Sequence, residues 1–549
     1  MTSAEKRRGG MESTRRVAII GAGVSGLACI KACLEEGLEP VCFEQHDELG
    51  GVWYYTDEPR PNQGATIYKS LVSNRTKEMM AFSDFPQPKE APPFLPYTQV
   101  HSYLREFADK FQLMKYIQFG VQVQHIWRAE DYTTSGKWMV RTAPVAADNN
   151  KNTCPQTSLF DRVMVCSGHF SKPFVPKVPG LEEFTGVVVH SRDYNGAESF
   201  KGRKVMVVGG ANSAGDVAAE VAQVASVVYL SVRDGIWLVP RLAQGGKPRD
   251  FFIQRARLNL PEWLKRILLR RQCNACVDHA NYGLQLEGCK DPIYGSTMIN
   301  DEMAFRLATG KVVTRPVVER FTRTGVVFSD GSKIDHLDAV VFATGYNVAI
   351  PFIESDILPR DVGDLELYKM MFPARLPHST LAVIGCVGTI GPIFPVLEIQ
   401  SRWAARVFSG HCKLPDPPSM QEWLRSNREK CRSKIGRVSL MVCTLPYCED
   451  IAQEIGVRPS FWQLLPRDPY LAYLVYFGPA FPTHYRLVGP HRWAGAARHV
   501  KLAVDNTYSA TRKSEHKPEH GFSSKVTIVK VMFTSLCVIA LGIVIGISY

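Results

Sequence analysis

The sequence lacks the repeated cysteine pairs of a disulfide framework or a zinc site. Its 14 cysteines are scattered through strand-like and helical stretches and are not spaced as a disulfide framework. The one CxxC, formed by Cys273 and Cys276 with His279 close behind, has no second pair of ligands, so we expect an ordinary helix or loop there rather than a zinc site. The cysteine usage predicts a reducing compartment and no metal.

The sequence also lacks a hydrophobic leader and a nucleic-acid-binding motif. Residues 1–16 are polar and basic, which argues against a signal peptide. The formal net charge of +12 would suit a nucleic acid, but much of the excess lies in two end segments, so we expect no nucleic-acid partner. A hydrophobic content of 45% over 549 residues is typical of a folded protein with several domains.

An intact phosphate-binding turn stands near the N-terminus, in RRVAIIGAGVSGLACI. The apolar run at residues 17–20 predicts a buried parallel strand, and the GxGxxG pattern after it opens a helix. The three glycines serve a tight turn, close backbone approach to a pyrophosphate, and packing of helix against strand. A second strand, LEPVCFEQ, carries Glu44, placed 23 residues after Gly21 to bind a ribose hydroxyl. A chance glycine-rich turn is the alternative. The expected nucleotide contacts are Gly21, Ala22, Gly23, Val24, Ser25, Gly26 and Glu44.

A second turn, KVMVVGGANSAGD at residues 204–216, carries alanine in place of two glycines. Ala214 takes the position that sets only helix–strand packing, so we expect it to be tolerated. Ala211 places a methyl group where the backbone should approach the pyrophosphate, and it should weaken binding without abolishing it. We expect Gly210 and Gly215 to give the turn room to relax. The expected contacts in this turn are Gly209, Ala211, Ser213, Ala214, Gly215 and Asp216.

Arg233 ends the strand VVYLSVR, where an NAD-dependent enzyme would carry an acid. A planar cation at this position suits a 2′-phosphate and favours NADPH over NADH. A solvated surface arginine is the alternative.

The two turns predict an α/β fold with two Rossmann-like dinucleotide-binding domains, the second inserted into the first, plus a C-terminal transmembrane helix. We expect HLDAVVFATGY to return the chain to the first domain. The expected divisions are a basic extension (1–15), the first domain (16–200), the inserted domain (201–335), the rest of the first domain (336–445), a globular segment (446–510), a polar linker (511–525) and a membrane tail (526–549).

Residues 531–549 form an uncharged, apolar run. Nineteen residues in a helix span roughly 28 Å, close to the thickness of a bilayer core of about 30 Å. Lys525 and Lys530 flank only its N-terminal side, so we expect a tail anchor with the rest of the chain facing the cytosol. A buried core helix is the alternative.

Residues 262–272, EWLKRILLRRQ, predict an amphipathic helix. Its apolar stripe suits either a membrane surface or a core face, and the pattern does not decide between them. The stripe consists of Trp263, Leu264, Ile267 and Leu268, set against Lys265, Arg266, Arg270 and Arg271.

From residue 16 to residue 510 the chain resembles the flavin-containing monooxygenases. The motifs that carry the resemblance are GAGVSGL for FAD, FTGVVVHSRDY at residues 184–194, VVGGANSAGD for NADPH, and FATGY at residues 342–346. The second follows the pattern FxGxxxH with an aromatic residue four positions on. That residue is Tyr194, where related Baeyer–Villiger enzymes usually have tryptophan. The stretches DHANYGLQ, EIQSRWAA and VYFGPAFPTHYRLVGP resemble the membrane-bound animal branch, which implies an endoplasmic reticulum membrane and a role in xenobiotic metabolism.

The resemblance implies that NADPH reduces FAD, that O₂ forms a C4a-hydroperoxyflavin, and that one oxygen atom passes to a soft nitrogen or sulfur of an amine or thioether. Baeyer–Villiger oxidation of a carbonyl, an NADPH oxidase releasing hydrogen peroxide, and an inactive membrane-anchored scaffold are the alternatives. The oligomeric state stays open. Disulfide-reductase chemistry would need a redox cysteine pair after Gly51 and Trp53, and the sequence has none there.

The resemblance also implies a catalytic asparagine, Asn74, next to Ser73. A neutral amide can donate a hydrogen bond to an oxygenated flavin without protonating it. A turn-capping asparagine is the alternative. Val52 and Trp53 join Ser73 and Asn74 among the expected FAD contacts. His190, at the end of a valine run, is expected to be structural or domain-linking and is not taken as the catalytic base.

Overall fold

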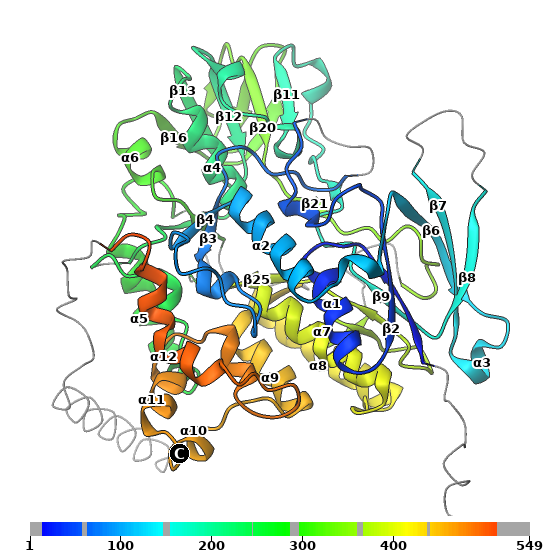
Figure 1. Cartoon of the computed structure of the whole chain (residues 1–549). Coiled ribbons are helices and arrows are strands. Elements are labelled where there is room, and N and C mark those ends of the chain that lie inside the picture. Colours follow the sequence, from blue (N-terminus) through cyan, green and yellow to red (C-terminus); the bar gives the residue numbers. More distant parts are fainter. Residues whose placement is uncertain are drawn as a thin grey trace, which may run out of the picture.

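Two five-stranded parallel sheets organise the protein in the computed structural model (Figure 1). The structure describes residues 14–57, 63–145, 154–243, 245–285, 292, 296–358, 366–435 and 440–512. The expected membrane tail at residues 526–549 and most of the basic extension lie outside these residues. Within the described ranges, no helix combines the length and the apolar composition needed to cross a membrane.

The first sheet has the order β24-β9-β1-β2-β5. Its strands are β1 (Arg16–Ile20), β2 (Glu39–Glu44), β5 (Ile117–Phe119), β9 (Arg162–Val165) and β24 (Leu381–Val383). Val17 and Ile19 belong to the core formed with the helices, whereas Ala18 and Ile20 belong to the core on the opposite face. Burial on both faces explains why the sequence of β1 is a continuous apolar run, as predicted.

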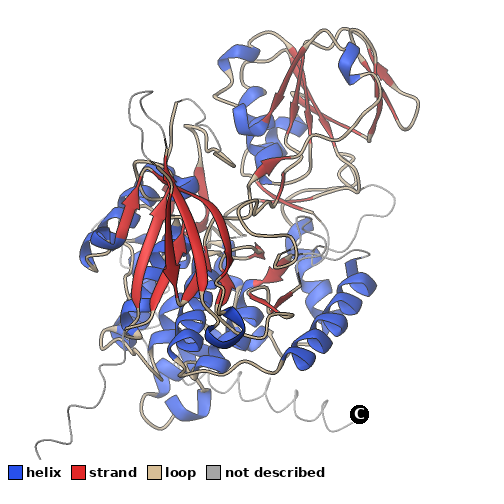
Figure 2. Cartoon of the chain, turned by 90° about the vertical axis from the view of Figure 1, so that its right-hand side faces the viewer, coloured by secondary structure: helices blue, strands red, loops and turns tan. Residues whose placement is uncertain are grey.

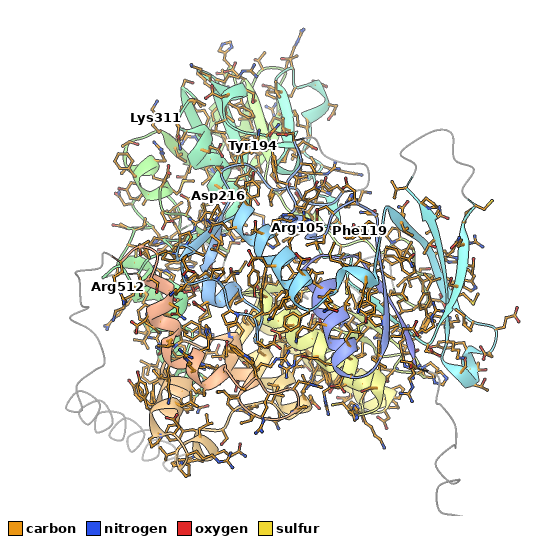
Figure 3. All side chains as sticks on the ribbon, viewed as in Figure 1. Arg105, Phe119, Tyr194, Asp216, Lys311 and Arg512 are labelled. Carbon is orange, nitrogen blue, oxygen red and sulfur yellow. The ribbon has the colours of Figure 1, made fainter. Side chains whose placement is uncertain are left out.

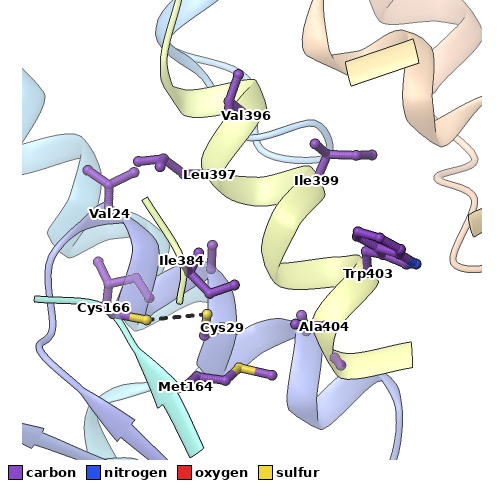
Figure 4. Close-up of a cluster of buried hydrophobic side chains, with 14 of the residues drawn as sticks. Val24, Cys29, Met164, Cys166, Ile384, Val396, Leu397, Ile399, Trp403 and Ala404 are labelled. Carbon is purple, nitrogen blue, oxygen red and sulfur yellow. Dashed lines mark hydrogen bonds between the residues drawn. The ribbon is translucent and has the colours of Figure 1, made fainter. Parts of the chain in front are cut away.

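Helices cover one face of this sheet and a small antiparallel sheet covers the other. The helices include α1 (Val24–Glu35), α2 (Tyr97–Lys110), α7 (Phe394–Ser409) and α9 (Thr444–Ile455), and the small sheet consists of β6 (Val121–Arg128), β7 (Trp138–Pro144) and β8 (Gln156–Phe160). Figure 4 shows the helical side, where Val24 and Cys29 of α1 lie opposite Leu397 and Ala404 of α7.

The second sheet has the order β11-β20-β12-β13-β16 and repeats the same three-layer plan (Figure 2). Its strands are β11 (Val187–His190), β12 (Lys204–Val208), β13 (Val227–Ser231), β16 (Val312–Arg315) and β20 (Ala339–Phe342). Val205 and Val207 face the core that includes α4 (Asn212–Val221), and Met206 faces the opposite core. That opposite core includes the antiparallel strands β17 (Val318–Phe321), β18 (Val326–Phe328) and β19 (Lys333–Ile334).

The strand of FATGY does not return the chain to the first domain, so that prediction is wrong. β20 pairs with β12, with Phe342 opposite Val208, and β11 pairs with β20 although it precedes residue 200. The chain passes between the two domains at β10 (Lys172–Pro173) and at β21 (Tyr346–Asn347), and these two strands pair antiparallel with each other. An apolar run identifies a buried parallel strand, but it does not identify the sheet that the strand joins.

A buried ion network attaches the C-terminal segment to the first domain. Arg486, in a short 3₁₀ helix at residues 482–486, lies 3.0 Å from Glu35, 3.1 Å from Asp84 and 3.2 Å from Glu398. Nearly complete burial makes this arrangement costly to break, because removal of one partner leaves uncompensated charge. The other helices of the C-terminal part are α8 (Pro417–Ile435), between α7 and α9, and α10 (Phe461–Leu464), α11 (Pro469–Phe477) and α12 (Ala496–Tyr508), which follow α9.

The predicted amphipathic helix is α5 (Glu262–Asn274), and its apolar stripe faces outward. Trp263 is 63% exposed and Ile267 is 44% exposed, while Cys273 is the buried residue of this helix. The stripe is therefore not a core face of its own domain.

Candidate active site

The first turn joins β1 to α1 and requires glycine at two positions. Gly21 has a φ of +101°, and a Cβ there would lie 2.9 Å from the carbonyl oxygen of Cys166. A Cβ on Gly26 would lie 1.9 Å from the carbonyl oxygen of Gly21. These contacts agree with the predicted mechanical roles of a tight turn and close helix–strand packing.

A second glycine pair covers the same turn. The Cα of Gly51 lies 3.5 Å from the position of a Cβ on Gly23, and the Gly50 N–H donates to the Ala22 carbonyl over 3.0 Å. Val52 follows with 38% exposure, and the ring of the half-buried Trp53 contacts Phe394 edge-on. Residues 50–53 therefore lie against the turn.

Glu44 ends β2 beside the same turn, as predicted. Its Oε2 accepts a hydrogen bond from the Ala22 N–H over 2.7 Å, and its Oε1 accepts one from the His46 N–H over 2.9 Å. These two hydrogen bonds hold the carboxylate of the buried Glu44 beside the turn.

The second turn joins β12 to α4 and tolerates both alanines. Gly209 has a φ of +148°, and a Cβ there would lie 2.3 Å from the Ala343 carbonyl oxygen. Ala214 is fully buried without displacing the turn. Ala211 precedes α4 in an extended conformation, with φ −112° and ψ −172°, and it is exposed. Its backbone is one that any residue adopts, so the cost of its methyl group falls on whatever binds the turn.

The glycines expected to relax this turn are closely packed instead. A Cβ on Gly210 would lie 2.7 Å from Ile236 Cγ2, and a Cβ on Gly215 would lie 2.7 Å from Met298 Cγ. The structure therefore does not leave the room that we expected from these two positions.

Three further predicted contacts of the second turn differ in accessibility. Ser213 is exposed in the first turn of α4, and Arg233 is 68% exposed with its Nε donating to Asp234 over 3.0 Å. Asp216, which is labelled in Figure 3, instead accepts hydrogen bonds from the Tyr68 hydroxyl over 2.5 Å and from the Asn300 amide over 2.9 Å. Burial raises the pKa of Asp216. The carboxylate of Asp216 is thus engaged by protein groups.

Asn74 lies in β3 (Val72–Thr76), which pairs with β4 (Phe94–Pro96). Its Oδ1 is buried and has no hydrogen-bond partner among the described residues. A buried amide oxygen without a partner is costly, which is typical of a group reserved for a ligand. Neighbouring Ser73 instead serves the fold, since its Oγ accepts from the Leu95 N–H and donates to the Arg75 carbonyl.

The family comparison decides what these turns bind. A model described as FMO-like, flavin-binding monooxygenase-like, matches residues 14–545. The chain belongs to this family. Rat flavin-containing monooxygenase 3 is 41% identical over 504 residues, which cover 90% of this chain and 92% of the rat protein. Rat dimethylaniline monooxygenase (N-oxide-forming) 2 is 40% identical over 495 residues, covering 88% and 90%.

A solved structure shares the fold of this flavin-containing monooxygenase. S-allyl-L-cysteine S-oxygenase from Allium sativum superposes with a TM-score of 0.61, at 23% identity, and the match covers 90% of this chain and 99% of that one. The similarity at this identity supports the architecture of two Rossmann-like sheets.

The cofactors of this flavin-containing monooxygenase are FAD and NADPH. The first turn fits the FAD pyrophosphate, because the first-turn N–H groups of α1 follow Gly23, where no side chain blocks access. At the equivalent position of the second turn, the exposed Ala211 carries a methyl group.

His190 is a connecting residue in this structure. Its Nε2 donates to the Gly345 carbonyl over 3.1 Å, and its Nδ1 accepts from the Arg192 N–H over 3.1 Å. Burial lowers the pKa of the imidazole, which favours this neutral form. Both nitrogens are used by the backbone, so the ring is not placed as a general base.

The Cys273–Cys276–His279 stretch packs into the second domain. His279 Nε2 lies 3.1 Å from the Leu238 carbonyl oxygen, and Cys273 is buried. Within the described ranges, no three His, Cys, Asp or Glu side chains are grouped so that they could hold a metal ion.

Sequence reasoning missed the residues that hold β3 from the inserted domain. Arg241 donates to the Ser73 carbonyl across 168 positions of sequence, and Asp250 accepts from the Thr76 N–H across 174 positions. No local pattern marks either residue, because each contact depends on how the two domains pack together.

Proposed function

We propose that the protein is an NADPH- and O₂-dependent flavin monooxygenase that transfers one oxygen atom to a soft nitrogen or sulfur of a small amine or thioether. NADPH, a proton, O₂ and the substrate would give NADP⁺, water and the oxygenated product. The names of two similar proteins, an N-oxide-forming monooxygenase and an S-oxygenase, support this substrate class. The observation that carries the proposal is the buried Oδ1 of Asn74, which has no hydrogen-bond partner among the described residues and can accept a hydrogen bond from a ligand.

Bound FAD would supply the redox chemistry that activates O₂. The protein would supply binding and orientation: the N-terminus of α1 holds a pyrophosphate, Glu44 holds a ribose, and exposed Arg233 holds a 2′-phosphate. The Nδ2 of Asn74, while its Oδ1 accepts from the bound ligand, would donate a hydrogen bond at the reacting oxygen. Because the amide is neutral, the oxygen would be stabilised without being protonated and released as hydrogen peroxide.

A second outcome, NADPH oxidation with release of hydrogen peroxide, is favoured by the methyl group of Ala211. Weaker retention of the nicotinamide nucleotide would leave the reacting oxygen open to water. Oxidation of a carbonyl by the same site is the remaining alternative.

The purified protein tests this proposal directly. We expect a yellow protein that oxidises NADPH and converts N,N-dimethylaniline or methyl phenyl sulfide to its oxide. Asn74→Ala should retain FAD and NADPH oxidation but lose at least tenfold in product formed per NADPH, with hydrogen peroxide in its place. Equal product yield from Asn74→Ala would remove Asn74 from this role.

We also propose that the protein lies on the cytosolic face of the endoplasmic reticulum membrane, anchored by residues 526–549 and resting on α5. The apolar run and its flanking lysines support the anchor. Exposed Trp263 and Ile267, bordered by basic side chains, support the contact of α5 with a lipid surface.

Hydrogen exchange in lipid nanodiscs tests the contact. The α5 peptide should be protected relative to detergent, whereas α6 (Met303–Ala308), whose Phe305 is 65% exposed, serves as the matched control and should not change. Equal exchange of α5 in both media would exclude the surface contact. Removal of residues 526–549 should release the protein from the membrane fraction of cells.

A further inference from the structure

The strand that carries Asn74 is poorly held by its own sheet. Among the described residues, β3 pairs with the three-residue β4 and with no other strand. The register shifts between Val72, opposite Pro96, and Thr76, opposite Phe94. The interruption falls on residues 73–75, where the Ser73 side chain replaces a backbone acceptor for Leu95. The ladder therefore does not fix the backbone at Asn74.

Arg241 of the inserted domain holds β3 immediately before Asn74. Its Nε donates to the Ser73 carbonyl over 3.0 Å, and its Nη2 donates to the Val72 carbonyl over 3.2 Å. Asp301 fixes Arg241 in turn. Its carboxylate accepts a hydrogen bond from the Arg241 Nη1 over 2.6 Å and another from the Arg241 backbone N–H over 2.8 Å. Two parallel hydrogen bonds from one planar guanidinium fix orientation as well as distance.

Asp250 of the same inserted segment holds β3 just after Asn74. Its Oδ2 accepts from the Thr76 N–H over 2.7 Å and from the Thr76 hydroxyl over 3.0 Å. Asp250 is buried, in a short 3₁₀ helix at residues 249–252. Backbone groups on both sides of Asn74 are thus held by residues 241 and 250, in addition to the pairing of the ends of β3 with β4.

The segment that ends at Arg241 also lies against the second nucleotide turn. It begins after β13 with Arg233, and Ile236 reaches to within 2.7 Å of the Cβ position on Gly210. The strand β14 (Trp237–Val239) then leads to Arg241. One short stretch therefore connects the NADPH turn to the backbone beside Asn74.

We propose that Arg241 and Asp250 are positioning residues that fix Asn74 for oxygen transfer, and that Arg241 makes this position depend on the NADPH-binding segment. The proposal rests on the proposed function of Asn74. Neither residue needs to touch substrate or cofactor. Without Arg241, β3 should move, and the amide of Asn74 should no longer lie where oxygen is transferred.

Arg241→Ala and Arg241→Lys test the first part in the full-length holoprotein. We expect the peptide spanning residues 70–80 to exchange backbone hydrogen at least fivefold faster in Arg241→Ala, in the presence and absence of NADP⁺. The fraction of NADPH that ends in hydrogen peroxide should rise at least threefold, with KM for NADPH changed less than twofold. Lysine cannot donate two hydrogen bonds in the fork geometry of a guanidinium, so Arg241→Lys should restore little of the product formed per NADPH.

Guanidinium chloride at millimolar concentration, far below denaturing levels, should partly restore product yield to Arg241→Ala but not to Asn74→Ala. Arg306→Ala is the matched control, because Arg306 pairs with Glu302 in the same domain and does not reach β3. It should leave both readouts unchanged. Asp250→Asn should loosen the same peptide from the Thr76 side, since the loss of charge weakens two hydrogen bonds.

A double-mutant cycle separates this proposal from the proposed function. If Asn74 stabilises the reacting oxygen and Arg241 positions Asn74, the double variant Asn74→Ala with Arg241→Ala should form as much product per NADPH as Asn74→Ala alone. The positioning role would be overturned if Asn74→Ala lost product per NADPH while Arg241→Ala kept the normal yield. A normally coupled Asn74→Ala would overturn the proposed function of Asn74, whatever Arg241 does. Normal exchange of residues 70–80 in Arg241→Ala would also overturn the positioning role.

Discussion

The two nucleotide turns have the same backbone plan but different tolerance for a methyl group. In the first turn a Cβ at position 26 would lie 1.9 Å from the Gly21 carbonyl oxygen, so α1 presses directly on its turn. In the second, Ala214 occupies the equivalent position and is fully buried. The carbonyl of Gly209 must therefore stand clear of α4. Close packing of α1 on its turn makes glycine obligatory at this position of the first turn, whereas looser packing of α4 allows alanine in the second.

At the middle glycine position of the two turns, the backbone itself does not require glycine. Gly23 and Ala211 are both extended, with φ values of −75° and −112°, so neither position requires the conformational freedom of glycine. The methyl group of Ala211 is exposed, and its effect falls on the ligand. The first turn is thus constrained by the protein, whereas the second is constrained by what it binds.

Substitution at the third glycine should produce the largest difference between the turns. Gly26→Ala should lower the free energy of unfolding by about 3 kcal/mol or more and leave the protein largely without FAD, because a backbone carbonyl cannot yield to the new methyl group. The reverse change, Ala214→Gly, should cost about 1 kcal/mol and retain FAD. FAD content and thermal unfolding measure both, and a yellow Gly26→Ala protein of normal stability would contradict the packing argument.

Removal of the cation near the second turn should affect one nucleotide only. Arg233→Gln should weaken NADPH binding about tenfold, the loss of one charge-assisted contact, and leave NADH binding unchanged. Titration of each nucleotide measures this, with Arg320→Gln as a control on an exposed arginine of the same domain. Equal weakening of NADPH and NADH would show that Arg233 does not read the 2′-phosphate.

Acid should destabilise the protein through a histidine close to the first turn. His169 follows β9 three residues after Cys166, and burial lowers its pKa to about 4. Its Nδ1 donates to the Gly385 carbonyl over 3.1 Å. Below about pH 6.5 the unfolded chain takes up a proton at His169, whereas the folded chain does so only near pH 4. The free energy of unfolding therefore decreases as the pH falls from about 6.5 to about 4, by about 2 kcal/mol at pH 5.

His169→Asn keeps a donor for Gly385 and removes the titration. The variant should lose less thermal stability than the natural protein between pH 7.5 and pH 5.0. Parallel losses in the two proteins would assign the acid sensitivity to other groups.

Restoring the second glycine of the second turn should give the smallest effect. Ala211→Gly should tighten NADPH binding about fivefold, or about 1 kcal/mol, and should reduce hydrogen peroxide release. A fluorescence titration of NADPH measures the affinity. An unchanged dissociation constant would place the methyl group clear of the pyrophosphate.

Local features of this site could be predicted from the sequence, because they depend on neighbouring residues. Gly21, Gly26 and Glu44 lie where a strand–turn–helix–strand pattern places them. The assignment of β20 failed because an apolar strand of four residues carries no label for its sheet. Arg241 and Asp250 could not be found, since their contacts join distant segments and arise only when the domains pack.

The pairing of β10 with β21 has a consequence for how the molecule changes over evolutionary time. The chain leaves the first domain and re-enters it through two adjacent strands, with Lys172 opposite Asn347. The ends of the intervening unit therefore lie side by side, so that unit can be exchanged as a cassette without a long bridging segment. Nucleotide preference can thus be altered in one half of the protein while the flavin half keeps its closely packed turn.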